Sequence, residues 1–165
     1  MEEHAISQKP EQIVKELAKQ KAKAIMNKIK EEQYIIIGAD TVVAYENTVL
    51  GKPKTKKDAK KMLEMLSGKT HSVYTGVALL MVHQNEIVKE KTFYEETKVT
   101  MRAYSSSVID EYIATKEPMD KAGSYGIQGK GAILVDYIQG DYNNVVGLPL
   151  AKTYWEIRKL QAHMK

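Results

Sequence analysis

Hydrophobic positions in the first part of the chain recur at helical spacing. From residue 10 to about residue 31, apolar side chains return every three or four positions, and lysines occupy the opposite side. Such a stripe is typical of an amphipathic helix. Pro10 suits the first turn of a helix, and Glu11 suits its positive end. The pattern therefore predicts a helix over residues 10–31.

Two shorter segments also show helical patterns, each with a candidate cap at its start. Thr55 precedes a stripe of Met and Leu and stands three residues before Asp58, which is the spacing of a capping box. Ser106 or Ser107 is expected to cap a short helix that runs through Ala114. Both segments are more typical of helices that pack on a core than of partner or membrane surfaces.

Residues 34–45 form an apolar run without alternation that is rich in β-branched side chains. This composition is typical of a strand that is buried on both faces, as in the middle of an α/β sheet. Residues 46–47 are expected to turn the chain into a short return strand over residues 48–50.

Two longer strands follow and are predicted to pair as a hairpin. They cover residues 73–82 and 87–102, with a turn at residues 84–85. A last strand is expected at residues 133–138 and a closing helix at residues 151–165. Because helices alternate with strands, the predicted class is α/β.

The chain has the length and composition of one folded domain, residues 1–165. Hydrophobic residues make up 43% and charged residues 28% of the sequence, which excludes a fully disordered chain. It contains no cysteine, so disulfide scaffolds, thiolate metal sites and cysteine nucleophiles are excluded. It has no membrane-length apolar run, and its first residues are acidic and polar, so a cytoplasmic location is expected.

The net charge of +4 comes almost entirely from lysine. Only two of the 25 basic residues are arginine, whereas proteins that read nucleic-acid grooves favour the planar fork of arginine. The lysines are also spread along the chain. The pattern favours a solvated lysine-rich surface over a nucleic-acid-binding face, and it suits a small anionic substrate such as a nucleotide.

Asp40 is the sharpest anomaly in the sequence, because it places a carboxylate inside an apolar strand. A lone buried carboxylate is costly unless a partner compensates it. One explanation is an Asp at the strand end that backbone N–H groups or a lysine satisfy. The other is a carboxylate at the carboxyl end of a central strand, where it could hold Mg²⁺ or accept a proton from water.

Two loops offer further candidate residues. Lys52 stands between glycine and proline and could meet a phosphate, although this segment alone favours an ordinary surface lysine. Residues 121–131 are rich in glycine and contain Lys121, which could meet an anion. They also contain Gln128, whose amide suits the reading of a base edge. The spacing matches neither a P-loop nor a dinucleotide fingerprint, so a flexible loop stays open as the alternative.

Six short sequence strings, in a fixed order along the chain, contain these candidate residues. They are residues 17–22 (LAKQKA), 38–43 (GADTVV), 50–53 (LGKP), 66–77 (LSGKTHSVYTGV), 117–129 (EPMDKAGSYGIQG) and 140–150 (GDYNNVVGLPL). The ordered set resembles the Maf family of nucleoside triphosphate pyrophosphatases. The resemblance implies an elongated α/β fold like that of inosine triphosphate pyrophosphatases, with a mixed sheet flanked by helices and a central cleft. The GIQG string resembles the branch that acts on dTTP and UTP.

The resemblance also implies a reaction, the hydrolysis of a nucleoside triphosphate to a monophosphate and pyrophosphate. By this similarity, Asp40 matches the family's proposed proton acceptor, and Lys52 matches a catalytic lysine of the cleft. A divalent cation, Mg²⁺ or Mn²⁺, is implied as the cofactor. Asp40 and Glu3 are the implied metal ligands. The metal and the lysines would stabilise charge that develops on the phosphate oxygens.

Further positions are implied to bind or select the substrate. Thr41 and Gln128 match positions of the family that are linked to substrate choice. Lys21 and Lys121 match cationic residues of the cleft. A homodimer is the partner that the family resemblance suggests.

Family members begin with an apolar strand, a loop that reads approximately Ser-x-Ser-Pro-Arg-Arg and a helix, none of which this sequence shows. An N-terminal truncation is therefore expected. Three explanations stay open: an internal start within a longer product, a decayed inactive copy, or a missing part supplied by another chain. The alternative function is a catalytically impaired protein that acts as a regulatory or binding protein in cell-division arrest.

Overall fold

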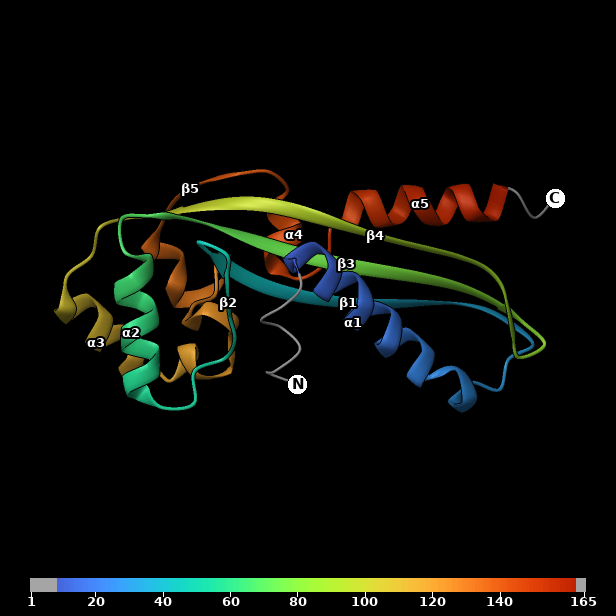
Figure 1. The fold of residues 1–165 in the computed structure, drawn as a ribbon, viewed down its shortest axis with the longest axis horizontal. Helices are drawn as coiled ribbons and strands as arrows, with labels where there is room; N and C mark the ends of the chain where they lie inside the picture. The colour runs from blue at the N-terminus through green and yellow to red at the C-terminus, as the bar shows by residue number, and fades with distance from the viewer. Residues whose placement is uncertain (1–8, 163–165) are drawn as a thin grey trace.

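A five-stranded sheet forms the framework of the molecule, with β1, β3 and β4 extending along its long axis (Figure 1). A computed structural model describes residues 9–162 of the chain. The strand order is β2-β1-β3-β4-β5, and every neighbouring pair is antiparallel. The strands are β1 (Gln33–Tyr45), β2 (Thr48–Leu50), β3 (Thr70–His83), β4 (Glu86–Met101) and β5 (Val135–Gln139).

Two tight turns set the register of this sheet. Glu46 and Asn47 join β1 to β2 with φ angles of 47° and 66°, and Gln84 and Asn85 join β3 to β4 with φ angles of 49° and 64°. Two-residue turns with positive φ at both positions match the right-handed twist of paired strands. Both turns are where the sequence predicted them.

Helix α1 (Pro10–Ala24) covers one face of the sheet. Its buried Val14, Ala18 and Ala22 lie against β1 and β3, where Gly38 and Gly76 leave room for the helix backbone. A Cβ atom at Gly38 would lie 2.3 Å from the carbonyl oxygen of Ala18, and one at Gly76 would lie 2.2 Å from that of Val14. The close contact of α1 with the sheet therefore requires these two glycines.

α1 ends earlier than the sequence predicted. The helix was expected to reach about residue 31, but it stops at Ala24 and is followed by a short 3₁₀ turn, η1 (Met26–Lys28). Ile25 is 41% exposed, so its apolar side chain does not prolong the buried stripe. The backbone carbonyl of Met26 accepts a hydrogen bond from the Tyr34 hydroxyl of β1 at 3.2 Å, which ties the turn to the sheet.

The opposite face of the sheet is covered in two parts (Figure 1). At one end of the molecule, α2 and α3 enclose a core with the sheet; toward the other end, α5 lies over β3 and β4. The apolar contacts under α5 come from Leu148, Ile157 and Leu160 against Val77, Leu79 and Phe93. The helices are α2 (Lys56–Leu66), α3 (Ser106–Ala114) and α5 (Leu150–Ala162).

The glycine-rich segment that was expected to be a loop folds into short 3₁₀ turns beside α2. They are η2 (Glu117–Asp120), η3 (Ala122–Ser124) and η4 (Gly129–Leu134). A short helix, α4 (Tyr142–Val146), follows β5 and was not predicted. The Asp141 side chain caps it by accepting a hydrogen bond from the Asn143 N–H at 2.8 Å.

The predicted α/β class is confirmed, although the described strands pair only in antiparallel fashion where the resemblance implied a mixed sheet. The capping box of α2 is confirmed, because Thr55 Oγ1 accepts from the Asp58 N–H and Asp58 accepts from the Thr55 N–H. The cap of α3 is Ser105 and not Ser106 or Ser107. Ile37 is 47% exposed, so β1 is not covered on both faces along its whole length.

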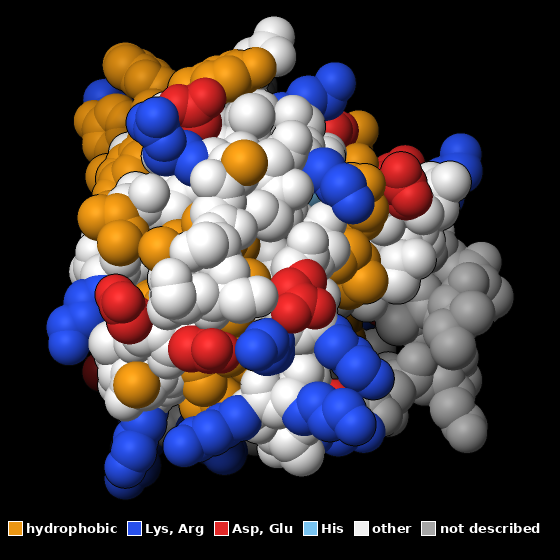
Figure 2. Space-filling view, turned by 90° about the vertical axis from the view of Figure 1, so that its left-hand side faces the viewer, with side chains coloured by type: hydrophobic (Ala, Val, Ile, Leu, Met, Phe, Trp, Pro, Cys, Tyr) orange, Lys and Arg blue, Asp and Glu red, His pale blue; other side chains and the backbone are white. Residues whose placement is uncertain are grey.

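Charged side chains of both signs share the surface at the α2–α3 end of the molecule. Figure 2 shows lysine and arginine side chains mainly along the lower part of this face, with acidic side chains across its middle and upper parts. Among the helices of residues 9–162, none is both long and apolar enough to cross a bilayer.

Candidate active site

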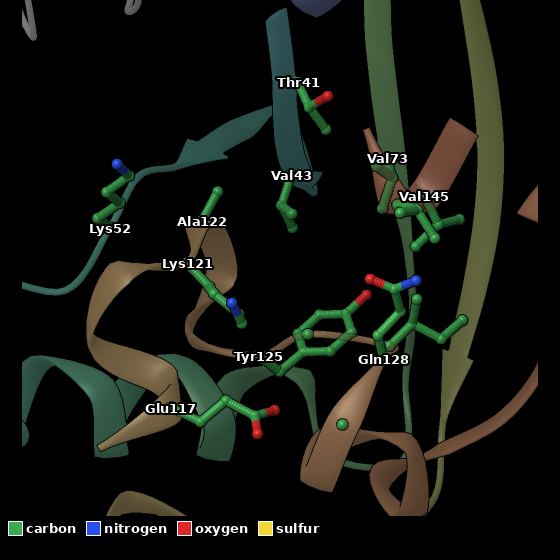
Figure 3. Close-up of a pocket in the computed structure, with 14 residues that line it drawn as sticks. Thr41, Val43, Lys52, Val73, Glu117, Lys121, Ala122, Tyr125, Gln128 and Val145 are labelled. Carbon is green, nitrogen blue, oxygen red and sulfur yellow. The ribbon is translucent and has the colours of Figure 1, made fainter. Parts of the chain in front are cut away.

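A cavity of about 470 Å³ lies on the sheet face opposite α1 (Figure 3). Thr41 and Val43 of β1 and Val73 of β3 line it from the sheet. Alternate side chains of a strand point to opposite faces, so Thr41 and Val43 share this side of β1. Lys52, several residues of segment 117–129, and Val145 and Val146 of α4 line the remaining walls. The cavity is thus assembled from segments that are distant in sequence.

Gln128 brings an unsatisfied amide to this cavity. In Figure 3 its side chain extends from the η3–η4 connection toward Val145. Within residues 9–162 the amide has no hydrogen-bond partner, so both its N–H₂ and its oxygen are available to a ligand. An amide that offers a donor and an acceptor side by side suits the edge of a nucleotide base.

Two lysines bring cationic groups to the same cavity, which the carboxylate of Glu117 also lines. Lys52 follows β2, and Lys121 precedes η3 and extends into the cavity beside Tyr125 in Figure 3. Lys121 Nζ lies 3.3 Å from Asp120 Oδ1 at the exposed surface. Lys52 has no ion-pair partner within the described residues. A phosphate group at this wall would therefore meet an uncompensated ammonium group.

Asp40 lies inside β1, not at its end as both explanations from the sequence assumed, because the strand continues to Tyr45. The alternation of β1 places its side chain on the α1 face, opposite to Thr41. Lys21 of α1 donates a hydrogen bond to Asp40 Oδ1 at 2.5 Å. The side chain of Asp40 is 15% exposed, so the ion pair compensates a carboxylate that is mostly removed from water.

One edge of β1 lies between the cavity face of the sheet, which carries Thr41, and the α1 face, which carries Asp40. β2 pairs only with Val43, Ala44 and Tyr45 of β1. In the described part of the chain, no strand pairs with that edge at Asp40 and Thr41. Asp40 and Thr41 therefore flank a stretch of this edge that no described strand covers.

Glu117 organises the segment that carries Gln128. Its carboxylate accepts hydrogen bonds from the Tyr112 hydroxyl at 2.9 Å and from the N–H groups of Lys130 and Gly131 at 3.1 Å each. Burial alone would raise the pKa of Glu117, but these three donors and the nearby charge of Lys121 lower it. Glu117 is therefore held as a carboxylate.

A buried histidine supports Tyr125, whose ring forms part of the cavity wall. The Tyr125 hydroxyl and His71 Nε2 are 2.5 Å apart, and His71 is only 2% exposed. Burial lowers the pKa of His71 to about 4 and raises that of Tyr125. Both groups are therefore neutral at pH 7, and this wall adds no charge to the site.

The Thr41 side chain is held by the buried hydroxyl of Thr75, its cross-strand partner on β3. Thr75 Oγ1 donates to the backbone carbonyl of Asn144 at 2.9 Å and lies 2.8 Å from Thr41 Oγ1. Because a hydroxyl has one proton, the Thr41 hydroxyl is the donor to Thr75. α4 is in turn anchored to the sheet by Asn144, whose Nδ2 reaches Thr97 and the carbonyls of Val73 and Glu95.

Comparison with protein families decides where the chain belongs. The family model of the Maf-like protein matches residues 1–160. The chain is a member of the Maf family. Its match covers all elements that build the cavity and the Asp40–Lys21 pair.

Curated relatives of this Maf chain carry the name dTTP/UTP pyrophosphatase. One from Agathobacter rectalis is 51% identical over 170 residues, which cover 96% of this chain and 83% of the relative. One from Bacillus cytotoxicus is 55% identical over 155 residues, 93% of this chain and 76% of the relative. One from Bacillus thuringiensis subsp. konkukian is 53% identical, with 91% and 75% covered.

The Maf fold gathers most of the site residues that the sequence singled out. Thr41, Lys52, Lys121 and Gln128 line one cavity. Asp40 and Lys21 pair with each other on the other side of β1 and are not among the residues that line the cavity. Glu3 lies outside the described residues. The catalytic and binding roles of all these side chains remain predictions.

Sequence reasoning missed the residues that support this Maf site. Glu117, Tyr112 and Thr75 act on the cavity through hydrogen bonds to distant segments, and no local pattern marks such partners. His71 is buried and bonded to Tyr125, which agrees with a structural role for this histidine. The one signal that could have pointed to them is the density of glycine around Gln128, although the sequence alone left a flexible loop open as the alternative.

Of the two predicted metal ligands, Asp40 is the one that lies within the described residues. No cluster of three or more His, Cys, Asp or Glu side chains suited to a metal ion occurs within residues 9–162. Lys21 occupies Oδ1 of Asp40, whereas Oδ2 accepts no hydrogen bond from the described part of the chain. One carboxylate oxygen fits Mg²⁺ or Mn²⁺, because such ions are often bound by one or two carboxylates together with substrate phosphates and water.

Proposed function

We propose that the chain hydrolyses dTTP and UTP to the nucleoside monophosphate and pyrophosphate. The observation that carries the proposal is the arrangement around the β1 edge. A free amide and two lysines face the cavity on one side, and a carboxylate–lysine pair lies on the other. Membership of the Maf family and the names of the curated relatives support the same reaction.

The proposed binding mode places the base in the cavity and the triphosphate along the β1 edge. Gln128 would hydrogen-bond the base beside Thr41. Lys52 and Lys121 would meet the phosphate oxygens as point charges. This orientation brings the α-phosphate toward Asp40, because the strand edge joins the two faces at this point.

In the proposed reaction, Asp40 accepts a proton from a water molecule that attacks the α-phosphorus. The bond between this phosphorus and the oxygen that bridges to the β-phosphorus breaks, and pyrophosphate leaves with the bridging oxygen. Lys21 keeps Asp40 in position through its 2.5 Å contact. A divalent cation held by Asp40 would supply charge neutralisation at the phosphates, and Glu3 remains a proposed second ligand.

The test is a pyrophosphate-release assay on dTTP and UTP with Mg²⁺ or Mn²⁺, for the original chain and for Asp40→Asn. We expect Asp40→Asn to lower kcat at least about 100-fold, because a positioned general base contributes at least that factor. Asp110→Asn is the matched control, since Asp110 is an exposed residue of α3 whose one ion pair among residues 9–162 is with Lys60. It should retain full activity and a similar melting temperature.

Full turnover by Asp40→Asn would remove Asp40 from this role. Tight binding of UMP and dTMP without hydrolysis of the triphosphates, with either metal, would contradict the enzymatic proposal. That result would instead support a regulatory protein that binds nucleotides.

A further inference from the structure

We propose that Glu117 is a positioning residue for base selection, because its carboxylate fixes both ends of residues 126–131 and thereby directs Gln128 into the cavity. The inference rests on the proposed function, since it assumes that Gln128 contacts the base. It adds a residue that acts on the substrate through another side chain and does not need to touch the substrate itself.

The carboxylate holds the far end of this segment directly. Glu117 Oε2 accepts from the Lys130 N–H, and Oε1 accepts from the Gly131 N–H, at 3.1 Å each. These two peptide groups follow Gln128 by two and three residues in the sequence. Hydrogen bonds to an ionised acceptor are about twice as strong as neutral ones, so one side chain sets the position of this end.

Tyr112 of α3 holds the near end. Its hydroxyl donates to Glu117 Oε1 at 2.9 Å and accepts from the Gly126 N–H at 3.1 Å. Because the hydroxyl proton goes to Glu117, the lone pairs of the same oxygen are directed to Gly126. Burial raises the pKa of Tyr112, so the hydroxyl keeps that proton. Glu117 therefore anchors Gly126 through Tyr112 as well as Lys130 and Gly131 directly.

Three glycines allow the backbone to close around the carboxylate. Gly129 has a φ of +71°, and a Cβ there would lie 3.0 Å from Glu117 Oε2. A Cβ at Gly131 would lie 2.2 Å from the carbonyl oxygen of Gly126 and 2.7 Å from the Tyr112 hydroxyl. The segment is therefore a compact loop around Glu117, with its two ends in contact and Gln128 between them.

The contrast between Glu117 and Gln128 indicates the division of roles. Both line the cavity, but the oxygens of Glu117 are engaged by three donors, whereas the amide of Gln128 has no partner within the described residues. A carboxylate would also repel the phosphates of a nucleotide. The geometry therefore assigns ligand contact to Gln128 and its orientation to Glu117.

The decisive variant is Glu117→Gln, which keeps the size of the side chain but replaces one acceptor oxygen by an N–H₂ donor. That donor would face a backbone N–H or the Tyr112 hydroxyl, so at least one anchor is lost. We expect the ratio of kcat/KM for UTP over CTP to fall about tenfold, the effect of losing one well-placed hydrogen bond. Amide hydrogen exchange in residues 126–131 should accelerate by a similar factor.

Two further variants separate positioning from general destabilisation. Glu111→Gln makes the same chemical change on an exposed residue of α3 and should leave both the ratio and the exchange unchanged. Tyr112→Phe removes the hydroxyl that bonds both Glu117 and Gly126 but leaves the bonds from the Lys130 and Gly131 N–H groups to Glu117, so it should reduce the ratio less than Glu117→Gln does. The double variant should lose less than the product of the two single effects, because both act through one network.

The same selectivity can be measured without turnover as the affinity ratio for UMP over CMP, which separates this inference from the proposed reaction. A chain that binds UMP preferentially but hydrolyses nothing, and that loses this preference in Glu117→Gln, would support the positioning role and contradict the reaction. An unchanged UMP/CMP ratio in folded Glu117→Gln would overturn the positioning role. Unchanged exchange in residues 126–131 would overturn it as well.

Discussion

Asp40 and Thr41 are neighbours in the chain but face opposite sides of the sheet. The pair can therefore serve two parts of one ligand, provided that the ligand crosses the strand edge between them. β2 leaves this edge unpaired in the described residues by ending opposite Val43. At the scale of single residues, the site depends on strand alternation as much as on side-chain chemistry.

His71 gives a pH prediction for stability at this scale. Its pKa is lowered from 6.5 to about 4 in the folded protein, so between these values the unfolded chain binds a proton that the folded chain does not. The free energy of unfolding should therefore fall as pH drops from about 6.5 to about 4, by roughly 3 kcal/mol at most. Urea unfolding at a series of pH values measures this slope.

The control for this prediction is a pair of histidine variants. Glutamine at position 71 cannot titrate, so His71→Gln should lack this fall in unfolding free energy between pH 6.5 and 4. His83→Gln, at the end of β3, should show the same fall as the original chain. Equal pH dependence in His71→Gln and the original chain would show that another group causes the acid sensitivity.

At the residue scale, the sequence identified the ligand-facing groups better than their supports. Asp40 was visible as a carboxylate in an apolar strand, and Gln128 was visible among glycines. The position of Asp40 within β1 was not predicted, because the end of a strand depends on pairing with β2 and β3. Glu117 could not be found either, since its three donors come from α3 and from residues after Gln128.

Among the elements, α1 matters to the site because it carries Lys21. Gly38→Ala should both destabilise the protein and separate Lys21 from Asp40, since the new Cβ would lie 2.3 Å from a backbone oxygen of α1. Overpacking of this kind costs about 1–3 kcal/mol. Denaturant unfolding measures the loss of stability, and pyrophosphate release at a temperature where the variant is folded measures the loss of activity.

Gly51→Ala is the matched control for α1 packing, because a Cβ at Gly51 would meet nothing within 4 Å. Its unfolding free energy should stay within about 0.5 kcal/mol of the original chain. Equal stability of both alanine variants would mean that α1 is free to shift away from the sheet at no cost.

A second prediction at this scale concerns the start of α2. Thr55→Ala removes the side-chain acceptor for the Asp58 N–H and should lower the free energy of unfolding by about 1 kcal/mol. Thr55→Ser should preserve most of it, because serine caps equally well. A loss as large in Thr55→Ser as in Thr55→Ala would exclude the cap as the cause.

Elements with local signals were predictable, and those set by distant contacts were not. The two tight turns and the capping box follow from residues close in sequence. The end of α1 was not predictable in this way: the chain passes into η1 after Ala24, and Met26 of that turn is bonded to the distant Tyr34 of β1. α4 has a local cap in Asp141, but its five residues are too few for a periodic pattern, and Asn144 holds it by bonds to β3 and β4.

At the scale of the whole molecule, the cavity joins β1, β3, α4 and the η2–η4 segment. A nucleotide bound there contacts all of them, so it should stabilise the fold globally. UMP at 100 times its dissociation constant should add about 2.7 kcal/mol to the unfolding free energy. This corresponds to a rise in Tm of about 5–10 °C for a chain of this size.

Differential scanning fluorimetry of the original chain with UMP tests this prediction, and Gln128→Ala provides the comparison. The variant should show a smaller rise at the same UMP concentration, since it lacks the free amide. An equal rise in both proteins would place the ligand away from Gln128.

The turn at Gln84 and Asn85 lies at the end of the molecule opposite α2 and α3 (Figure 1). The neighbouring Glu86 is exposed, and the sequence contains no cysteine. Glu86→Cys would therefore introduce a single thiol remote from the nucleotide cavity. A dye or solid support attached to that thiol would leave the cavity unobstructed, so single molecules could be observed while they bind and release nucleotides.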